Sequence, residues 1–266
     1  MNGVPSIKWS GWGLTDIGKV RKINQDTFAV RNDLQLWVVA DGMGGHVGGE
    51  VASRIAVETI TQYVASHVPF QNKDDDHDHS YEPYLVQALE FANQAIREEA
   101  QLNTILQGMG TTVVAIRIIN APSGDYATVA HAGDSRLYLF REGMLTLWTR
   151  DHTLMEERLE LKMITPEQVR THPLRHVLTK GLGIDPQVMP TVTTHALHSQ
   201  DLLLLCSDGL TKMLTDEEIQ VLLLKAHMPS QHLCETLIKT ANRLGGEDNT
   251  TVLVIGRHDD PTVRMT

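Results

Sequence analysis

Two strongly apolar runs in this chain each end close to an aspartate that is followed by glycine. They are Leu36–Ala40, followed directly by Asp41, and Leu202–Cys206, followed after one serine by Asp208. Aliphatic runs of this length between glycines and acidic residues are typical of buried strands. A carboxylate that follows such a strand lies at the edge of a hydrophobic core, where its charge needs a partner.

Two further aspartates occupy similarly punctuated motifs. Asp26 ends the motif R-K-I-N-Q-D, and Asp248 lies in G-G-E-D-N-T-T. Converging carboxylates repel one another unless a cation lies between them, and oxygen ligands suit hard divalent ions. Taken singly, each aspartate could be an ordinary turn or capping residue. Together they favour a divalent metal site, with Asp41 as a bridging ligand and the Gly42 carbonyl as a further oxygen donor.

Composition narrows the class of protein. The 266 residues suit one large domain, which we expect to span residues 1–266. A net charge of −10 argues against non-specific nucleic-acid binding, which needs a basic surface. The two cysteines, Cys206 and Cys234, lack zinc-site spacing, and neither a signal-peptide pattern nor an apolar stretch of about 20 residues is present. We therefore expect a cytoplasmic protein without a membrane segment.

The order of predicted elements indicates an α+β fold. Apolar residues at helical spacing predict helices around Ala52–Val64 and Leu85–Ile96, and a last helix over about 230–244. Capping boxes begin two more helices, at Thr165 and Thr215. Runs rich in β-branched residues predict strands at 27–30, 35–40, 111–119, 126–132, 136–140, 144–148, 192–196, 202–206 and 251–255. Because strands and helices do not alternate regularly, we expect antiparallel sheets with helices packed outside them.

Six motifs in this chain resemble, in order, those of the PPM family, the metal-dependent serine/threonine protein phosphatases of type 2C. They are T-D-I-G-K-V-R-K-I-N-Q-D (15–26), V-V-A-D-G-M-G-G-H-V-G-G-E (38–50), M-G-T-T (109–112), H-A-G-D-S-R-L-Y (131–138), S-D-G-L (207–210) and G-G-E-D-N-T-T (245–251). They span nearly the whole chain and are most similar to the compact bacterial branch of the family. That resemblance implies a four-layer αββα sandwich, with two central antiparallel sheets and helix pairs outside. It also implies a flap segment over about 151–183, near the active site.

The resemblance also implies a role for each site residue. Asp41 would bridge two Mn²⁺ or Mg²⁺ ions. Asp208 and Asp248 would complete the coordination of the first ion. The Gly42 carbonyl and, through water, Asp26 would serve the other ion. Asp134 would share a weaker third metal with Asp208, and Arg21 would bind the substrate phosphate as a planar fork. A hydroxide between the two ions would then hydrolyse phosphoserine or phosphothreonine by in-line attack.

Two departures from many eukaryotic members concern the first two motifs. Gln25 stands where those members have glutamate, and Met43 stands where they have a histidine that is proposed as the general acid. A thioether cannot donate a proton. The proton must therefore come from elsewhere, and metal-bound water is one source. His46 is a candidate catalytic residue, with an equally good interpretation as a loop residue that shapes substrate entry.

Two other segments admit a metal interpretation. The acidic segment 71–82 could be an accessory site, but an exposed loop is the simpler reading. The flap contains His152, His172 and His176, for which we favour structural hydrogen bonding, with His172 the first to test.

Three functions remain open from the sequence. The leading one is a Mn²⁺- or Mg²⁺-dependent phosphoprotein phosphatase in bacterial signalling, expected to be a monomer. Similarity to the cyanobacterial phosphatase of the phosphorylated PII signal protein makes PII a candidate substrate. One alternative is a catalytically silent, metal-binding pseudophosphatase, and another is a metallohydrolase that acts on nucleotides or small phosphate esters.

Overall fold

The computed structural model describes residues 9–43, 48–67, 82–226 and 230–257. The candidate residue His46 and all but the last residue of the acidic segment 71–82 lie outside these ranges. Within them, no helix has both the length and the apolar character that a membrane crossing requires.

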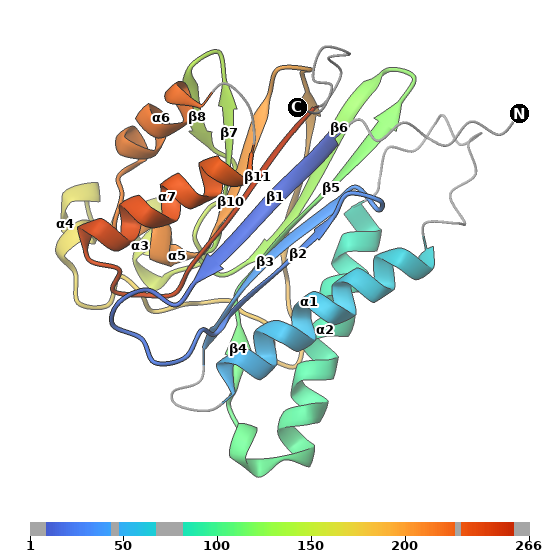
Figure 1. Cartoon of the computed structure of the whole chain (residues 1–266). Coiled ribbons are helices and arrows are strands. Elements are labelled where there is room, and N and C mark those ends of the chain that lie inside the picture. The colour runs from blue at the N-terminus through green and yellow to red at the C-terminus, as the bar shows by residue number, and fades with distance from the viewer. Residues whose placement is uncertain (1–8, 44–47, 68–81, 227–229, 258–266) are drawn as a thin grey trace, which may run out of the picture.

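Two antiparallel sheets form the centre of the molecule (Figure 1). In one sheet the order is β1 (Trp9–Asp16), β11 (Thr250–Arg257), β10 (Leu202–Cys206), β7 (Arg136–Arg141) and β8 (Met144–Leu147). In the other it is β2 (Asp26–Arg31), β3 (Leu36–Met43), β5 (Val113–Ala121), β6 (Gly124–Ala132) and β9 (Thr191–Leu197), with β4 (Gly110–Thr111) paired to β3.

The continuous apolar run of β3 is explained by burial on both of its faces. Trp37 and Val39 point into the core between the two sheets, where they meet Leu203 of β10 and Leu253 of β11. The alternate residues of β3 pack on the opposite side, against the helices. Successive side chains of a strand point to opposite faces, so a strand covered on both faces has no polar alternation.

Helices cover both outer faces of this sandwich (Figure 1). The sheet containing β3 is covered by α1 (Gly49–His67) and α2 (Glu82–Leu102), and a short 3₁₀ turn, η2 (Thr104–Leu106), follows α2. The other sheet is covered by α6 (Asp216–Lys225), α7 (Gln231–Leu244) and the short α5 (Asp208–Thr211). The predicted αββα architecture is confirmed.

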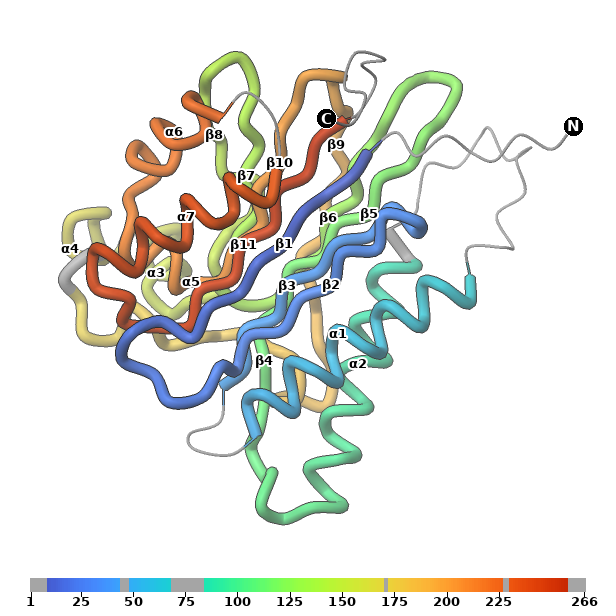
Figure 2. The backbone as a smooth tube through the Cα atoms, viewed as in Figure 1, coloured from blue at the N-terminus to red at the C-terminus, as the bar shows by residue number. Residues whose placement is uncertain are grey.

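The predicted strands and helices are all present, and the differences are one interrupted strand, the unpredicted strand β1, and two short unpredicted helices, α5 and the helix Leu154–Glu160. The strand predicted over 111–119 is interrupted at Thr112, whose backbone N–H turns to the Asp41 carbonyl at 2.9 Å. The strand β1 was not predicted, because Gly11 and Gly13 break its apolar pattern. These glycines permit close packing, since a Cβ on Gly13 would lie 2.6 Å from the Phe28 ring. Figure 2 shows β1 beside β11, so the first and last strands are neighbours.

The segment predicted as a flap contains α3 (Leu154–Glu160) and α4 (Pro166–Thr171). The predicted capping box of α4 is present, with Thr165 and Gln168 satisfying each other's backbone N–H groups. Both ends of the segment are tied together, since Thr179 N–H donates to the His152 carbonyl at 2.9 Å. That this segment acts as a flap stays a prediction.

Candidate metal centre

Asp26 and Asp41 come from neighbouring strands of one sheet. Asp26 begins β2, Asp41 lies near the end of β3, and the two residues are paired in the register of the strands. The backbone behind them is packed so closely that a Cβ on Gly42 would overlap the Gly49 carbonyl. Only glycine therefore fits after Asp41, which explains the Asp-Gly pair.

Asp208 and Asp248 come from the other sheet. Asp208 is the first residue of α5 and follows β10 after one serine, and Asp248 lies two residues before β11 begins. A hydrogen bond links this sheet to the first carboxylate pair, because the Ser207 hydroxyl donates to Asp26 Oδ2 at 2.7 Å. Thr251 of β11 donates to the same oxygen at 2.7 Å. The aspartates predicted from four separate motifs thus meet at one end of the sandwich.

Asp134 lies in the turn between β6 and β7, the connection that crosses from one sheet to the other. His152 supports this turn from the start of the predicted flap. Gly133 N–H donates to His152 Nδ1 at 3.2 Å, and His152 N–H donates to the Gly133 carbonyl at 3.0 Å. The His152 ring also stacks on His131, with ring centres 4.6 Å apart. His152 has the structural role favoured from the sequence.

Burial, and after it the charge of neighbouring carboxylates, raises the pKa of three aspartates in this cluster. Burial raises the pKa of Asp26 to about 6, even though its two hydroxyl donors oppose the shift. Burial and the charge of Asp208 raise the pKa of Asp134 to about 7. For Asp41, burial and then the charge of Asp26 raise the pKa well above its ordinary value. Ionised carboxylates in this arrangement are costly unless a cation offsets their charge.

Two side-chain cations already lie against part of the cluster. Lys212 Nζ lies 2.6 Å from Asp208 Oδ2 and 2.7 Å from Asp248 Oδ2. Arg21, predicted to bind phosphate, places Nε 2.8 Å from Asp248 Oδ1, and half of its side chain is exposed. Although burial opposes the effect, Lys212 and Arg21 lower the pKa of Asp248. Lys212 was not among the predicted site residues.

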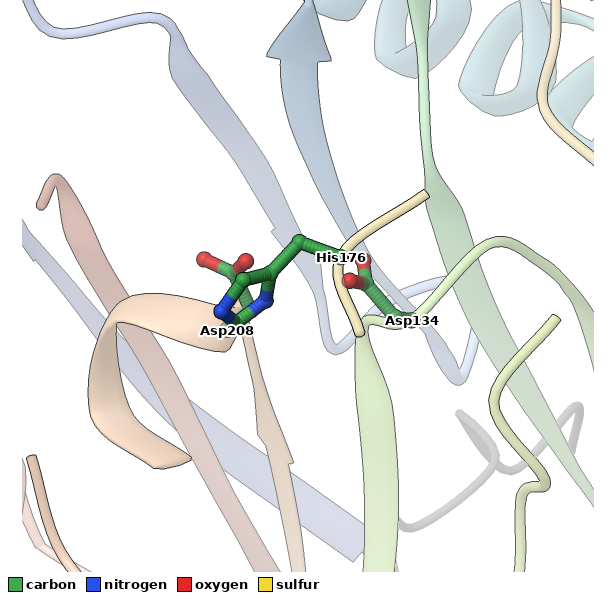
Figure 3. Close-up of side chains that lie close together, drawn as sticks. All are labelled: Asp134, His176 and Asp208. Carbon is green, nitrogen blue, oxygen red and sulfur yellow. The ribbon is translucent and has the colours of Figure 1, made fainter. Parts of the chain in front are cut away.

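The predicted flap brings one histidine to the carboxylates. Ligand atoms of His176, Asp134 and Asp208 all lie within 4.8 Å of one another, and Figure 3 shows the three side chains together. His172 is instead occupied locally, because its Nδ1 accepts the Leu174 backbone N–H at 3.1 Å. The sequence analysis put His172 first for testing, but the structure brings His176 to the carboxylates.

A further residue missed from the sequence is Asn249, which positions the loop that carries Arg21. Its amide donates to the carbonyls of Ile17 and Ile23, each at 3.0 Å, and its Oδ1 accepts the Gln25 N–H at 2.9 Å. The side chain is buried, so these bonds are shielded from water. Asn249 thereby joins the loop before Asp26 to the strand that follows Asp248.

Residues 19–253 match the sequence profile described as Protein phosphatase 2C. The chain belongs to this family. Protein phosphatase PhpP of Streptococcus pneumoniae is 34% identical over 251 residues, which cover 93% of this chain and 97% of PhpP. As a member of the family, the chain is a protein phosphatase.

Solved structures of bacterial serine/threonine phosphatases have the same fold as this chain. The serine/threonine phosphatase PstP/Ppp of Mycobacterium tuberculosis has a TM-score of 0.80 and 33% identity, covering 94% of this chain and 98% of that one. A PstP catalytic domain solved with two manganese ions has a TM-score of 0.78 and 33% identity, covering 95% of this chain and 99% of that one.

Independently of these relatives, two buried carboxylate oxygens of this chain support a site for divalent ions. Among the described residues, Asp26 Oδ1 and Asp208 Oδ1 are buried without a hydrogen-bond partner. Buried polar atoms normally have a partner, and an unpaired carboxylate oxygen is costly. Two open, buried oxygens within a group of mutually repelling carboxylates are therefore what an all-oxygen site for Mn²⁺ or Mg²⁺ requires.

Proposed function

We propose that this centre hydrolyses phosphoserine and phosphothreonine in proteins, with Asp41 as the bridging ligand of two divalent ions. Asp208 and Asp248 would complete one ion, and the Gly42 carbonyl and, through water, Asp26 would serve the other. The observation that carries the proposal is the convergence of Asp26, Asp41, Asp208 and Asp248, with open oxygens on two of them. The ions supply the positive charge that offsets the phosphoryl group and activates water.

Arg21 is the proposed phosphate-binding residue. Its Nε and Nη2 both reach Asp248 at 2.8 Å, so the guanidinium already presents two parallel donors to a pair of oxygens. Phosphate offers the same spacing of acceptors, which suits a bidentate arginine contact. The loop that carries Arg21 is fixed by Asn249, so the arginine is delivered to one edge of the centre.

The weaker third cation is proposed to lie between Asp134 and Asp208, with His176 as an added nitrogen ligand. The spacing of the three ligand atoms supports this assignment. An imidazole nitrogen suits transition-metal ions better than Mg²⁺. The third position should therefore favour Mn²⁺ over Mg²⁺ more strongly than the all-oxygen positions do.

The finer assignments follow the resemblance. We propose a monomer in which one catalytic domain, with its flap over 151–183, spans the chain, and phosphorylated PII protein is the candidate substrate. A cytoplasmic location is consistent with Cys206 and Cys234, which are both buried, unbridged thiols. Comparing dephosphorylation of phospho-PII with that of unrelated phosphoproteins tests the substrate, and equal rates would remove PII from consideration.

The experiment for the main proposal is initial-rate hydrolysis by the purified chain. The substrates are a phosphothreonine peptide, p-nitrophenyl phosphate and a nucleoside triphosphate, each with Mn²⁺, with Mg²⁺ and with EDTA. We expect peptide and aryl phosphate turnover that requires the metal and is lost in Asp41→Ala. Metal binding without turnover would support the pseudophosphatase, and a preference for the nucleotide would support a different metallohydrolase.

A further inference from the structure

Asp248 is saturated with hydrogen-bond donors. Its Oδ1 accepts from Arg21 Nε at 2.8 Å and from the Asn249 backbone N–H at 2.9 Å. Its Oδ2 accepts from Arg21 Nη2 at 2.8 Å and from Lys212 Nζ at 2.7 Å. Because a carboxylate has about four lone-pair positions, these four donors fill it. A metal ion that binds Asp248 must therefore displace one of them.

Lys212 is the donor that also holds a second proposed ligand. It lies four residues after Asp208, just past the end of α5, and its Nζ lies 2.6 Å from Asp208 Oδ2. The side chains are largely shielded, with exposed fractions of 23% for Lys212, 15% for Asp208 and 14% for Asp248. The ammonium thus takes one oxygen from each of two carboxylates that are proposed to bind the same divalent ion.

The other donors are less suited to exchange with a metal ion. The Asn249 N–H belongs to the backbone next to β11 and cannot leave without moving the strand. Arg21 contacts Asp248 alone among the two carboxylates, so its departure would leave the positive charge of Lys212 between Asp208 Oδ2 and Asp248 Oδ2, where it repels an incoming cation. Withdrawal of Lys212 opens an oxygen on both carboxylates at once, and its long, flexible stem permits that movement.

We propose that Lys212 is a built-in counter-ion that holds Asp208 and Asp248 together in the metal-free protein and is exchanged for the divalent cation. The inference rests on the proposed metal roles of these two aspartates. The exchange weakens metal binding, since the incoming ion displaces a shielded, charge-assisted contact. When divalent ions are scarce, the Lys212 ammonium offsets the repulsion between the two carboxylates. Lys212 would therefore set the metal concentration at which the centre fills.

The test uses Lys212→Met, which replaces the ammonium by an uncharged side chain of similar length. Mn²⁺ is titrated calorimetrically into the metal-free wild type and variant, and thermal unfolding is followed in EDTA and in saturating Mn²⁺. We expect the variant to bind Mn²⁺ more tightly by about tenfold, the scale of one lost charge-assisted contact. The metal-free variant should unfold at a lower temperature than the wild type, and the two Mn²⁺-loaded proteins at the same temperature.

Lys239→Met is the matched control. Lys239 also pairs with a carboxylate four residues away, Glu235 at 3.0 Å, but on the exposed surface of α7. Its removal should leave Mn²⁺ affinity unchanged. If Lys212→Met does not fold without metal, Lys212→Gln, which keeps a neutral donor, should give the same increase in affinity.

Two results would overturn the inference. Unchanged Mn²⁺ affinity, with equal loss of stability in both metal states, would show that Lys212 stays in place when the ion binds. Weaker Mn²⁺ binding would show that Lys212 orients the ligands instead of competing for them. A wild type that binds no Mn²⁺ would contradict the proposed metal centre itself, which separates failure of that proposal from failure of this one.

Discussion

Asp26 and Asp41 lie directly opposite each other on the antiparallel strands β2 and β3. Like charges in opposed positions destabilise a sheet, and Asp26 is buried as well. In the absence of metal ions, the pairing therefore destabilises the folded state at the position where these ions are proposed to bind.

Asp41→Asn should separate stability from function. We expect the metal-free variant to gain about 1 kcal/mol in unfolding free energy, because one of the opposed charges is removed. Mn²⁺-dependent turnover should fall by at least about a hundredfold, since a proposed bridging ligand is weakened. Urea unfolding in EDTA and initial rates with Mn²⁺ measure the two effects. The control is Asp33→Asn on the exposed turn between the same strands; full activity in Asp41→Asn would contradict the assignment.

Asp134 should make the metal-free protein sensitive to pH. Its pKa is raised from 3.8 to about 7, so the folded state binds this proton more tightly than the unfolded chain does. The resulting stability is present below pH 3.8 and is lost as the pH rises to about 7. Relative to Asp134→Asn, the metal-free wild type should lose stability across that range.

Urea unfolding of both proteins in EDTA, at several pH values, measures this difference. The difference in unfolding free energy between the two proteins is needed because His152 changes the stability with pH in the direction opposite to Asp134. Burial lowers its pKa to about 3, so its contribution to stability falls as the pH decreases from 6.5. That contribution is common to the wild type and the variant. Parallel stability curves for the two would show that Asp134 titrates normally.

His176→Ala should remove the weakest cation and leave the two tighter ones. The reason is that His176 lies beside Asp134 and Asp208, whereas the two tighter positions are proposed to use oxygen ligands alone. Titration of bound Mn²⁺ by electron paramagnetic resonance gives the number and affinity of the sites. His172→Ala, in the same segment but bonded locally, is the control. Loss of the weak site in both variants would indicate a general effect on the flap.

Asn249→Ala should loosen the loop that presents Arg21. The buried Asn249 side chain loses three hydrogen bonds at once, which should cost about 2–4 kcal/mol in unfolding free energy at about 1 kcal/mol each. The Michaelis constant for p-nitrophenyl phosphate should rise more than the turnover number falls, because the loop is proposed to bind phosphate. An unchanged Michaelis constant at Mn²⁺ saturation would contradict the proposed role of Arg21 in binding the phosphate.

The sequence predicted the elements of the fold more completely than the contacts of the centre. Buried strands such as β3 and β10 are unbroken apolar runs, and the helices carry clear caps, so local pattern was sufficient. The strand β1 was missed because its glycines are chosen for contact with Trp37 and Phe28, which lie on other strands. Such contacts leave no periodic signal.

The aspartates of the centre could be named from their motifs, but their partners could not. Lys212 lies in an ordinary helical end, and its contact with Asp248 depends on how β10 and β11 bring separate segments together. Asn249 contacts residues more than 220 positions away. His176 and His172 share one irregular segment, so only the path of the backbone decides which of them reaches the carboxylates.

The position of β11 sets a condition on when the enzyme can first become active. This strand lies between β1 and β10, and its residue Thr251 bonds to Asp26, 225 positions earlier in the chain. Among the described strands, β11 is the one that pairs with β1, so during synthesis residues 9–16 wait for residues 250–257 to complete this pairing. The centre of a growing chain therefore stays incomplete until Asp248 and β11 have been made, and any fragment that stops short of Asp248 lacks part of the centre.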